Sequence, residues 1–216
     1  MPPAEIWAHL VDATPYLMRG FAMNVLVSAV AMAIGTVFGW GLALLRLSPH
    51  ARRARFAELA TEFLRSMPTI VFQFYLVFIL PTSIPLPFVG GAWVFPLWLK
   101  ASLALSVAVV GFTSDNLTIA LRDWQRGHRR AAFLFIPSWT SYLLIIVMAS
   151  STASIVGVGE LVSHCNTIVN ASGGTALMLP VYLYACAIFF GFCFPLTLLM
   201  AQVSRQLALR LDPDPR

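Results

Sequence analysis

One acidic side chain stands inside a stretch that is otherwise free of charge. Between residues 101 and 121 the only charged residue is Asp115, and a run of that length can cross a bilayer as a helix. A carboxylate at membrane depth costs free energy unless it is paired or hydrated, so such residues are usually functional. In the alternative, structural role, Asp115 accepts hydrogen bonds from a neighbouring helix or from Thr118. We favour the structural role, since Arg122 would lie about 10 Å away by helix rise, too far for direct pairing.

A second group of polar side chains lies late in another uncharged stretch. Four of the five positions from 150 to 154 carry hydroxyls, namely Ser150, Ser151, Thr152 and Ser154. Small hydroxyl residues let helices approach closely in lipid. Four of them in five positions exceed what packing needs, so we favour a pathway that hydrogen-bonds a polar solute.

The composition excludes a soluble domain. Of the 216 residues, 59% are hydrophobic and 11% are charged, against about 25% charged in an average globular protein. The mean hydropathy is +0.80. The charge-free intervals predict an all-α integral membrane helical bundle. Its five transmembrane helices are expected at about 20–46, 66–80, 97–121, 133–154 and 175–205.

Basic residues fall in alternate connecting segments. Residues 48–65 and 122–130 contain four arginines each, and residues 205–216 contain three more. Residues 81–96 and 155–174 contain no lysine or arginine. Since cytoplasmic loops carry the excess of positive charge, the N-terminus is predicted outside and the C-terminus in the cytoplasm.

We expect one transmembrane domain over residues 1–216. Residues 1–18 lack the basic start and apolar run of a signal peptide and are predicted to lie as an amphipathic helix on the periplasmic interface. Residues 20–205 would form the transmembrane core, and residues 206–216 a cytoplasmic tail.

Gly35, Gly39 and Gly41 form a ridge of small residues in the first span. Such a ridge serves as a packing face within one subunit or as a seam between two. The pattern alone leaves both interpretations open.

Other kinds of site find little support. The three cysteines, an odd number at no metal-like spacing, predict neither a disulfide framework nor a metal site. The sequence contains no Walker glycine loop, so we expect the chain to bind no ATP of its own. Because the basic segment 122–130 lies between two spans, it favours contact with anionic lipid or a cytoplasmic protein over nucleic acid.

Three stretches, taken together and in order, resemble the membrane-spanning subunits of bacterial ABC importers for polar amino acids. The first is Arg65-Ser66-Met67-Pro68, followed by Gln73; the second places Asp115 twelve residues before Gly127. The third and closest is SSTASIVGVGEL at 150–161. The resemblance covers about 20–205 and implies a type I ABC importer permease fold in the bacterial inner membrane.

The resemblance also implies roles for particular residues. Arg65 and Pro68 would mark the cytoplasmic start of a span. Asp115 and the hydroxyls at 150–154 would face the substrate pathway, where the carboxylate could bind the ammonium group of an amino acid. The outer gate, or a contact with a binding protein, would involve Gly157, Gly159 and Glu160, although a solvated interfacial charge explains Glu160 equally well.

One segment departs from the family pattern. After Gly127 the family has a Glu-Ala-Ala coupling segment, whereas this chain has Arg130 at the glutamate position and keeps only Ala131 and Ala132. These four residues would lie nearest the ATPase. The loop is roughly twenty residues shorter than the motif leads one to expect. We therefore expect the second permease subunit to be a different chain with an intact coupling segment.

The resemblance implies a permease subunit that imports polar amino acids or related small zwitterions by ATP-driven alternating access. The implied partners are a second permease subunit, a cytoplasmic ATPase dimer that binds ATP and Mg²⁺, and a periplasmic solute-binding protein. The chain itself would bind no cofactor or metal. A scaffold or regulatory subunit that descended from a permease and is no longer coupled to ATP is the alternative. The short loop favours that alternative, and the 150–161 motif argues against it.

Overall fold

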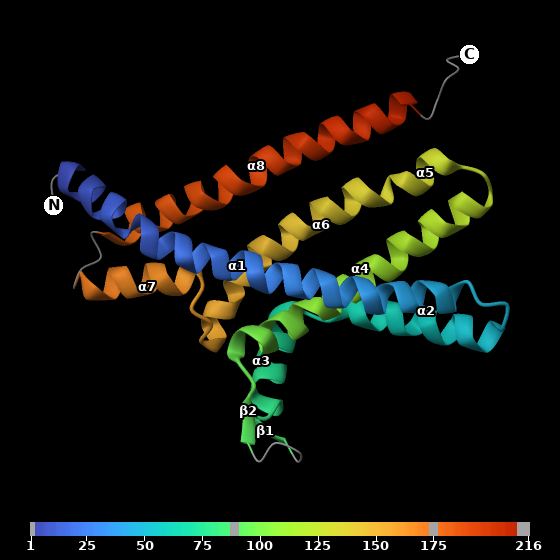
Figure 1. Cartoon of the computed structure of the whole chain (residues 1–216), viewed down its shortest axis with the longest axis horizontal. Coiled ribbons are helices and arrows are strands. Elements are labelled where there is room, and N and C mark those ends of the chain that lie inside the picture. The colour runs from blue at the N-terminus through green and yellow to red at the C-terminus, as the bar shows by residue number, and fades with distance from the viewer. Residues whose placement is uncertain (1–2, 87–90, 173–176, 211–216) are drawn as a thin grey trace.

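The computed structural model describes residues 3–86, 91–172 and 177–210, and it is dominated by helices (Figure 1). The all-α class and the membrane-type bundle are confirmed, with one short antiparallel hairpin among the described residues. The helices are α1 (Pro3–Arg46), α2 (Ala51–Ser66), α3 (Thr69–Ile79), α4 (Leu97–Gln125), α5 (Arg129–Phe133), α6 (Phe135–Ala149), the 3₁₀ helix η1 (Ser150–Val156), α7 (Leu161–Ala171) and α8 (Met178–Arg210). The hairpin of β1 (Ser83–Leu86) and β2 (Gly91–Val94) joins α3 to α4.

Four helical segments of the described chain are long and apolar enough to cross a membrane. They are Glu5–Arg46, Leu97–Gln125, Ala131–Val156 and Met178–Gln206. A fifth crossing exists only if α2 and α3 count as one broken span, because they meet at 96°. The 11 residues of α3 rise only about 16 Å, roughly half of a 30 Å hydrocarbon core. The predicted span at 66–80 is therefore too short to cross the membrane as one helix, and it could do so only together with α2.

Proline explains the break between α2 and α3. Met67 and Pro68 both have extended backbones, as expected for a residue before proline and for a proline that precedes a first helical turn. Pro68 is the N-cap of α3, directly before its first residue. The chain therefore turns sharply here, and in Figure 1 α3 runs across the direction of the long helices and has the hairpin at its end.

Helix α1 is continuous over 44 residues. The expected break between an interfacial segment at 1–18 and the first span is absent from the described residues. Leu10, Leu17 and Phe21 are buried in one cluster with residues of α7 and α8, including Leu161 and Val181. The first turns of α1 therefore pack on the chain's own helices.

The glycine ridge of α1 packs within the chain. A Cβ at Gly35 would collide with the side chain of Val109 on α4, and a Cβ at Gly39 would lie 2.6 Å from Cβ of Thr113. Gly41 faces open space. Gly35 and Gly39 therefore permit the close approach of α1 and α4, which answers the question left open by the sequence for these two positions.

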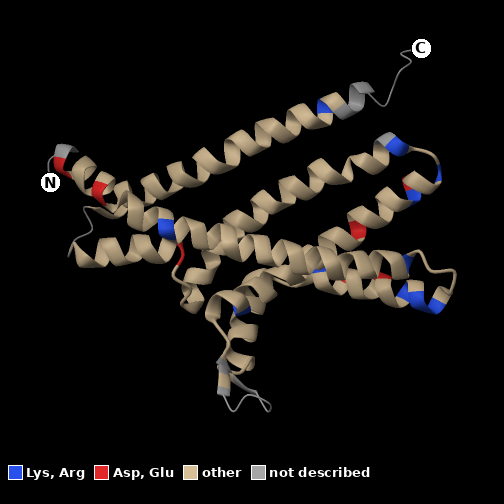
Figure 2. Ribbon diagram, viewed as in Figure 1, with Lys and Arg blue, Asp and Glu red and all other residues tan. Residues whose placement is uncertain are grey.

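Most Lys and Arg positions lie toward one end of the molecule, whereas Asp and Glu positions occur at both ends (Figure 2). Helix α1 has an acid, Glu5, in its first turn and Arg46 in its last. The basic positions of the sequence cluster where α1 and α4 end and α2 and α5 begin (Figure 2). The two ends of the bundle therefore differ in electrostatic character.

Candidate functional site

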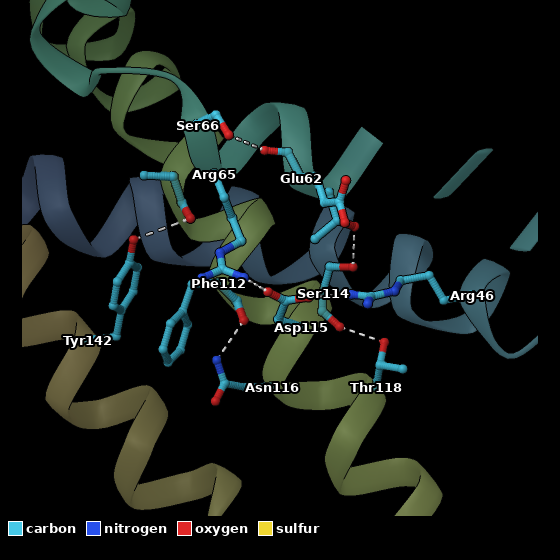
Figure 3. A network of polar contacts seen from close by, with 12 residues as sticks. Arg46, Glu62, Arg65, Ser66, Phe112, Ser114, Asp115, Asn116, Thr118 and Tyr142 are labelled. Carbon is cyan, nitrogen blue, oxygen red and sulfur yellow. Dashed lines mark hydrogen bonds and ion pairs between the residues drawn. The ribbon is translucent and has the colours of Figure 1, made fainter. Parts of the chain in front are cut away.

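Asp115 lies on α4 between the ends of α1 and α2 and is bound by two arginines (Figure 3). Its Oδ1 accepts a hydrogen bond from Nη1 of Arg46 at 2.5 Å, and its Oδ2 accepts one from Nη1 of Arg65. The side chains of Arg46 and Asp115 are 15% and 22% exposed, whereas that of Arg65 is 60% exposed. This ion-pair cluster joins three helices.

The sequence did not reveal these partners. Arg122, considered above, lies on the same helix, whereas Arg46 and Arg65 come from two other helices. Thr118 does not bind the carboxylate either, because its hydroxyl donates to the carbonyl oxygen of Ser114. Only the packing of α1 and α2 against α4 brings the arginines to Asp115.

Small residues bring the C-terminal end of α2 against α4. The hydroxyls of Thr61 on α2 and Ser114 on α4 are hydrogen-bonded at 2.8 Å, and both residues are buried. A Cβ at Gly111 would lie 2.6 Å from Cγ of Arg65. The absence of a side chain at Gly111 therefore makes space for the aliphatic part of Arg65, whose guanidinium group reaches Asp115. Arg65 belongs to this cluster in the last turn of α2, directly before the break that leads into α3, and its expected place at the cytoplasmic start of a span stays a prediction.

A cleft of about 270 Å³ opens beside the ion-pair cluster. It is lined by Arg65, Ala108, Phe112, Asp115, Asn116 and Tyr142. A larger cleft of about 580 Å³ lies among α4, α6 and α8. Phe112, Asn116 and Tyr142 line both clefts. Phe112 and Tyr142 stack with ring centroids 3.8 Å apart. The two clefts thus share an aromatic wall, with charged groups on one side and mainly apolar groups on the other.

The hydroxyl stretch forms the 3₁₀ helix η1, and its side chains diverge. Ser150 is buried and accepts a hydrogen bond from Asn24, whereas Thr152 donates to Oε1 of Gln73 on α3 at 2.7 Å. Ser154 donates to the backbone of Ser151. A 3₁₀ helix has three residues per turn, so consecutive side chains point about 120° apart. The four hydroxyls therefore form no single polar wall, and their role in a pathway stays a prediction.

Glu160 is buried, with 1% of its surface exposed. It is the N-cap of α7, where its carboxylate accepts hydrogen bonds from the backbone N–H groups of Val162 and Ser163 and from Nδ2 of Asn24. Burial raises the pKa of its carboxyl above the ordinary value, and these hydrogen bonds oppose the rise. The interpretation of Glu160 as a solvated charge is wrong, and its carboxylate is not on a surface that another protein could touch.

The structure also explains the two glycines before Glu160. Gly157 ends η1 with φ of +90°, a conformation that side chains other than glycine rarely adopt. Gly159 is exposed. The predicted loop at 155–174 in fact contains α7. Whether this segment gates an outer mouth stays a prediction.

Two buried polar residues were not anticipated as site residues. Asn24 donates from Nδ2 to Ser150 and Glu160 at 2.9 Å each, and its Oδ1 accepts from the backbone N–H of Leu161. Lys100 is 1% exposed and donates from Nζ to the carbonyl oxygens of Val77 and Leu80 at the C-terminal end of α3. Polar residues inside or beside apolar spans were the available signal.

The proposed coupling residues lie in the connection from α4 to α6. Gly127 has φ of +84°, which suits glycine and turns the chain after α4. Arg130, Ala131 and Ala132 belong to α5, which has only five residues. Phe133 packs edge-on against Trp124 of α4 with ring centroids 5.7 Å apart. This turn is closed by aromatic packing at the basic end of the bundle.

No metal centre is evident in the part of the chain that the structure describes. No group of three or more His, Cys, Asp or Glu side chains gathers there.

The fold and several relatives define the class of protein. A crystal structure described as that of an amino acid ABC transporter with histidines superimposes with a TM-score of 0.73 at 16% identity, covering 92% of this chain and 97% of that chain. The chain is therefore a multi-pass membrane protein with the fold of an ABC transporter permease. No family model matches the chain.

Sequence relatives agree with this fold. The probable amino-acid ABC transporter permease protein YckA of Bacillus subtilis is 29% identical over 211 residues, 85% of each chain. The glutamate/aspartate import permease protein GltK of Escherichia coli is 27% identical over 142 residues, 65% of this chain and 63% of its own length. The chain is therefore similar in sequence to amino-acid ABC transporter permeases.

Proposed function

We propose that this subunit carries amino acids or related small zwitterions across the bacterial inner membrane as part of an ATP-driven importer. The observation that carries the proposal is the cleft beside Asp115, where charges of both signs lie within the bundle. Ionisable groups at membrane depth usually mark a pathway for a polar solute. The names of both sequence relatives support amino acids as the cargo.

Energy for transport would come from partner subunits. ATP and Mg²⁺ would bind to two cytoplasmic ATPase subunits, and a second permease subunit and a periplasmic solute-binding protein would complete the importer. Closure of the ATPases would then rock the two permease halves about a central pathway. The turn from Gly127 through α5 would lie nearest the ATPase, because it is at the basic end of the bundle.

The charge distribution supports one orientation. Cytoplasmic segments of membrane proteins carry the excess of arginine and lysine. The basic end of the bundle in Figure 2 would accordingly face the cytoplasm, and the acidic first turn of α1 would face the periplasm. In this orientation the N-terminus would be outside and the C-terminus inside.

A scaffold or regulatory subunit remains a second candidate, and one observation favours it. Helix α5 has only five residues, Arg129–Phe133, and offers little surface for contact with an ATPase. If this helix does not transmit the motion of the ATPase subunits, only the second permease subunit would be coupled to ATP hydrolysis.

The test is purification of the tagged subunit from its own membranes, identification of the proteins that accompany it, and reconstitution of that complex in proteoliposomes. We expect a permease, an ATPase and ATP-dependent uptake of a radiolabelled amino acid. Asp115→Asn should lower uptake, because it leaves two arginines without their anion, whereas Asp123→Asn at the end of the same helix should not. Recovery without an ATPase, or a complex that transports no amino acid, would refute the transport function in favour of the scaffold.

A further inference from the structure

The ion-pair cluster has an excess of positive charge. Arg46 and Arg65 contribute two positive charges, and Asp115 contributes one negative charge. Glu62, one turn earlier on α2, is exposed and does not line the cleft beside the cluster. The cluster therefore carries a net charge of +1 next to a cleft of about 270 Å³, since one carboxylate cannot neutralise two guanidinium groups.

Asp115 is poorly suited to bind the ammonium group of a substrate. Each of its carboxylate oxygens already accepts a hydrogen bond from an arginine. Binding an ammonium group there would require it to compete with two guanidinium groups. Binding of the ammonium group, the role that the resemblance implied for Asp115, is therefore unfavourable. The carboxylate instead positions an arginine.

Arg65 has the donors for that contact. A guanidinium group has five N–H donors in a planar fork that suits a carboxylate. Among the described residues Arg65 uses one nitrogen, Nη1, for Asp115. Its side chain is 60% exposed and lines the cleft, so its remaining donors are available to a ligand there.

The same cleft contains a neutral acceptor. Nδ2 of Asn116 donates to the carbonyl oxygen of Phe112 at 2.9 Å, which fixes the orientation of the amide (Figure 3). Its Oδ1 makes no hydrogen bond within the described part of the chain and can accept one from an ammonium group. A site with a free guanidinium fork and an amide oxygen can bind the two charged ends of an amino acid, while its net charge favours an additional carboxylate.

We propose that this cleft selects anionic amino acids, those with a side-chain carboxylate, and that Arg65 recognises a substrate carboxylate while Asp115 positions Arg65. This assignment rests on the proposed transport function and adds the charge of the substrate. Charge attraction in the cleft is stronger than in bulk water, because the helices that partly bury Asp115 lower the local dielectric constant. A net charge of +1 should therefore discriminate between glutamate and the nearly isosteric, neutral glutamine.

The test is equilibrium binding to the detergent-purified complex of this chain with its partner permease and ATPases, without the solute-binding protein. Tritiated L-glutamate and L-glutamine serve as probes, so that only the membrane complex sets the preference. We expect glutamate to bind more tightly than glutamine. Arg65→Gln should weaken glutamate binding about tenfold to a hundredfold, the range for one hydrogen bond to a charged group, and should weaken glutamine binding much less.

Two further variants separate recognition from structure. Arg65→Lys keeps the charge and should retain the preference for glutamate, with weaker binding because the fork is lost. Arg55→Gln, an exposed position on the same helix, makes the same change of charge away from the cleft and should leave both affinities unchanged. All variants should co-purify with the partner subunits, which shows that the complex still assembles.

The outcomes distinguish this inference from the function on which it rests. Equal binding of the two probes by the original protein, or an equal loss for both in Arg65→Gln, would overturn the assignment of Arg65 as the residue that recognises the carboxylate. The transport function would still stand if proteoliposomes took up any amino acid with ATP. Absence of uptake for every amino acid would refute the transport function itself.

Discussion

Replacement of Asn24 by alanine should be strongly destabilising. Asn24 is completely buried and makes three hydrogen bonds that join α1 to η1 and to the start of α7. Alanine would leave the backbone N–H of Leu161 without an acceptor in a fully buried position. It would also take one donor from the buried carboxylate of Glu160.

The magnitude follows from these two losses. A buried N–H without a partner costs about 1–3 kcal/mol, and a lost hydrogen bond to a charged group costs about 1.5–3 kcal/mol. Ser150 loses less, because its hydroxyl still donates to the carbonyl oxygen of Val147. The expected loss of unfolding free energy is thus about 3–5 kcal/mol, well above the ~1 kcal/mol of an average substitution.

The assay is denaturant-induced unfolding of the purified protein in detergent micelles, combined with hydrogen exchange of α7. Asn24→Ala should lower the unfolding free energy and speed exchange in the first turn of α7, where Leu161 and Val162 lie. Asn170→Ala is the matched control, since Asn170 is exposed on α7 and should change stability by less than about 0.5 kcal/mol. A loss below 1 kcal/mol for Asn24→Ala, or exchange in α7 that does not change, would refute this account of the network.

Three further predictions concern other parts of the fold. Because burial raises the pKa of Glu160, the folded protein binds more protons than the unfolded chain between the ordinary and the raised pKa; the unfolding free energy of the original protein minus that of Glu160→Gln should rise as pH falls through this window, and a difference independent of pH would contradict it. Gly35→Leu should cost at least the 1–3 kcal/mol typical of overpacking, because its side chain meets α4, whereas Gly41→Leu faces open space and should be tolerated in the same unfolding assay. Lys100→Met should accelerate hydrogen exchange at the end of α3, whose carbonyls lose a charged donor, while exchange in α7 stays unchanged; equal exchange in α3 would show that the ammonium group does not hold that end.

The two interrupted parts of the bundle contact each other. Gln73 of α3 is fully buried and accepts a hydrogen bond from Thr152 of η1. Its Nε2 has no hydrogen-bond partner among the described residues. Irregular backbone at membrane depth is tolerated where protein covers it or where it lines a wet cavity. This contact therefore joins the two elements at which the regular helices of the bundle are broken.

Local sequence determined the class of this protein and the positions of most of its long helices. Hydropathy and charge are properties of a single stretch of chain, so uncharged runs of about 20 residues indicate spans wherever they later pack. The arginines of alternate loops gathered at one end of the bundle for the same reason. Pro68 and Gly127 also had local consequences, a helix break and a turn with positive φ.

Only the tertiary structure decided which polar groups meet. Asp115 could not be paired from the sequence, because Arg46 and Arg65 lie 69 and 50 residues away along the chain. The sequence left open whether Glu160 is a gate residue or a solvated charge, and only the packing of α7 on α1 brought Asn24 to its carboxylate. The direction of a side chain and its burial depend on which helices become neighbours, and that choice is made by contacts between distant segments that no local pattern records.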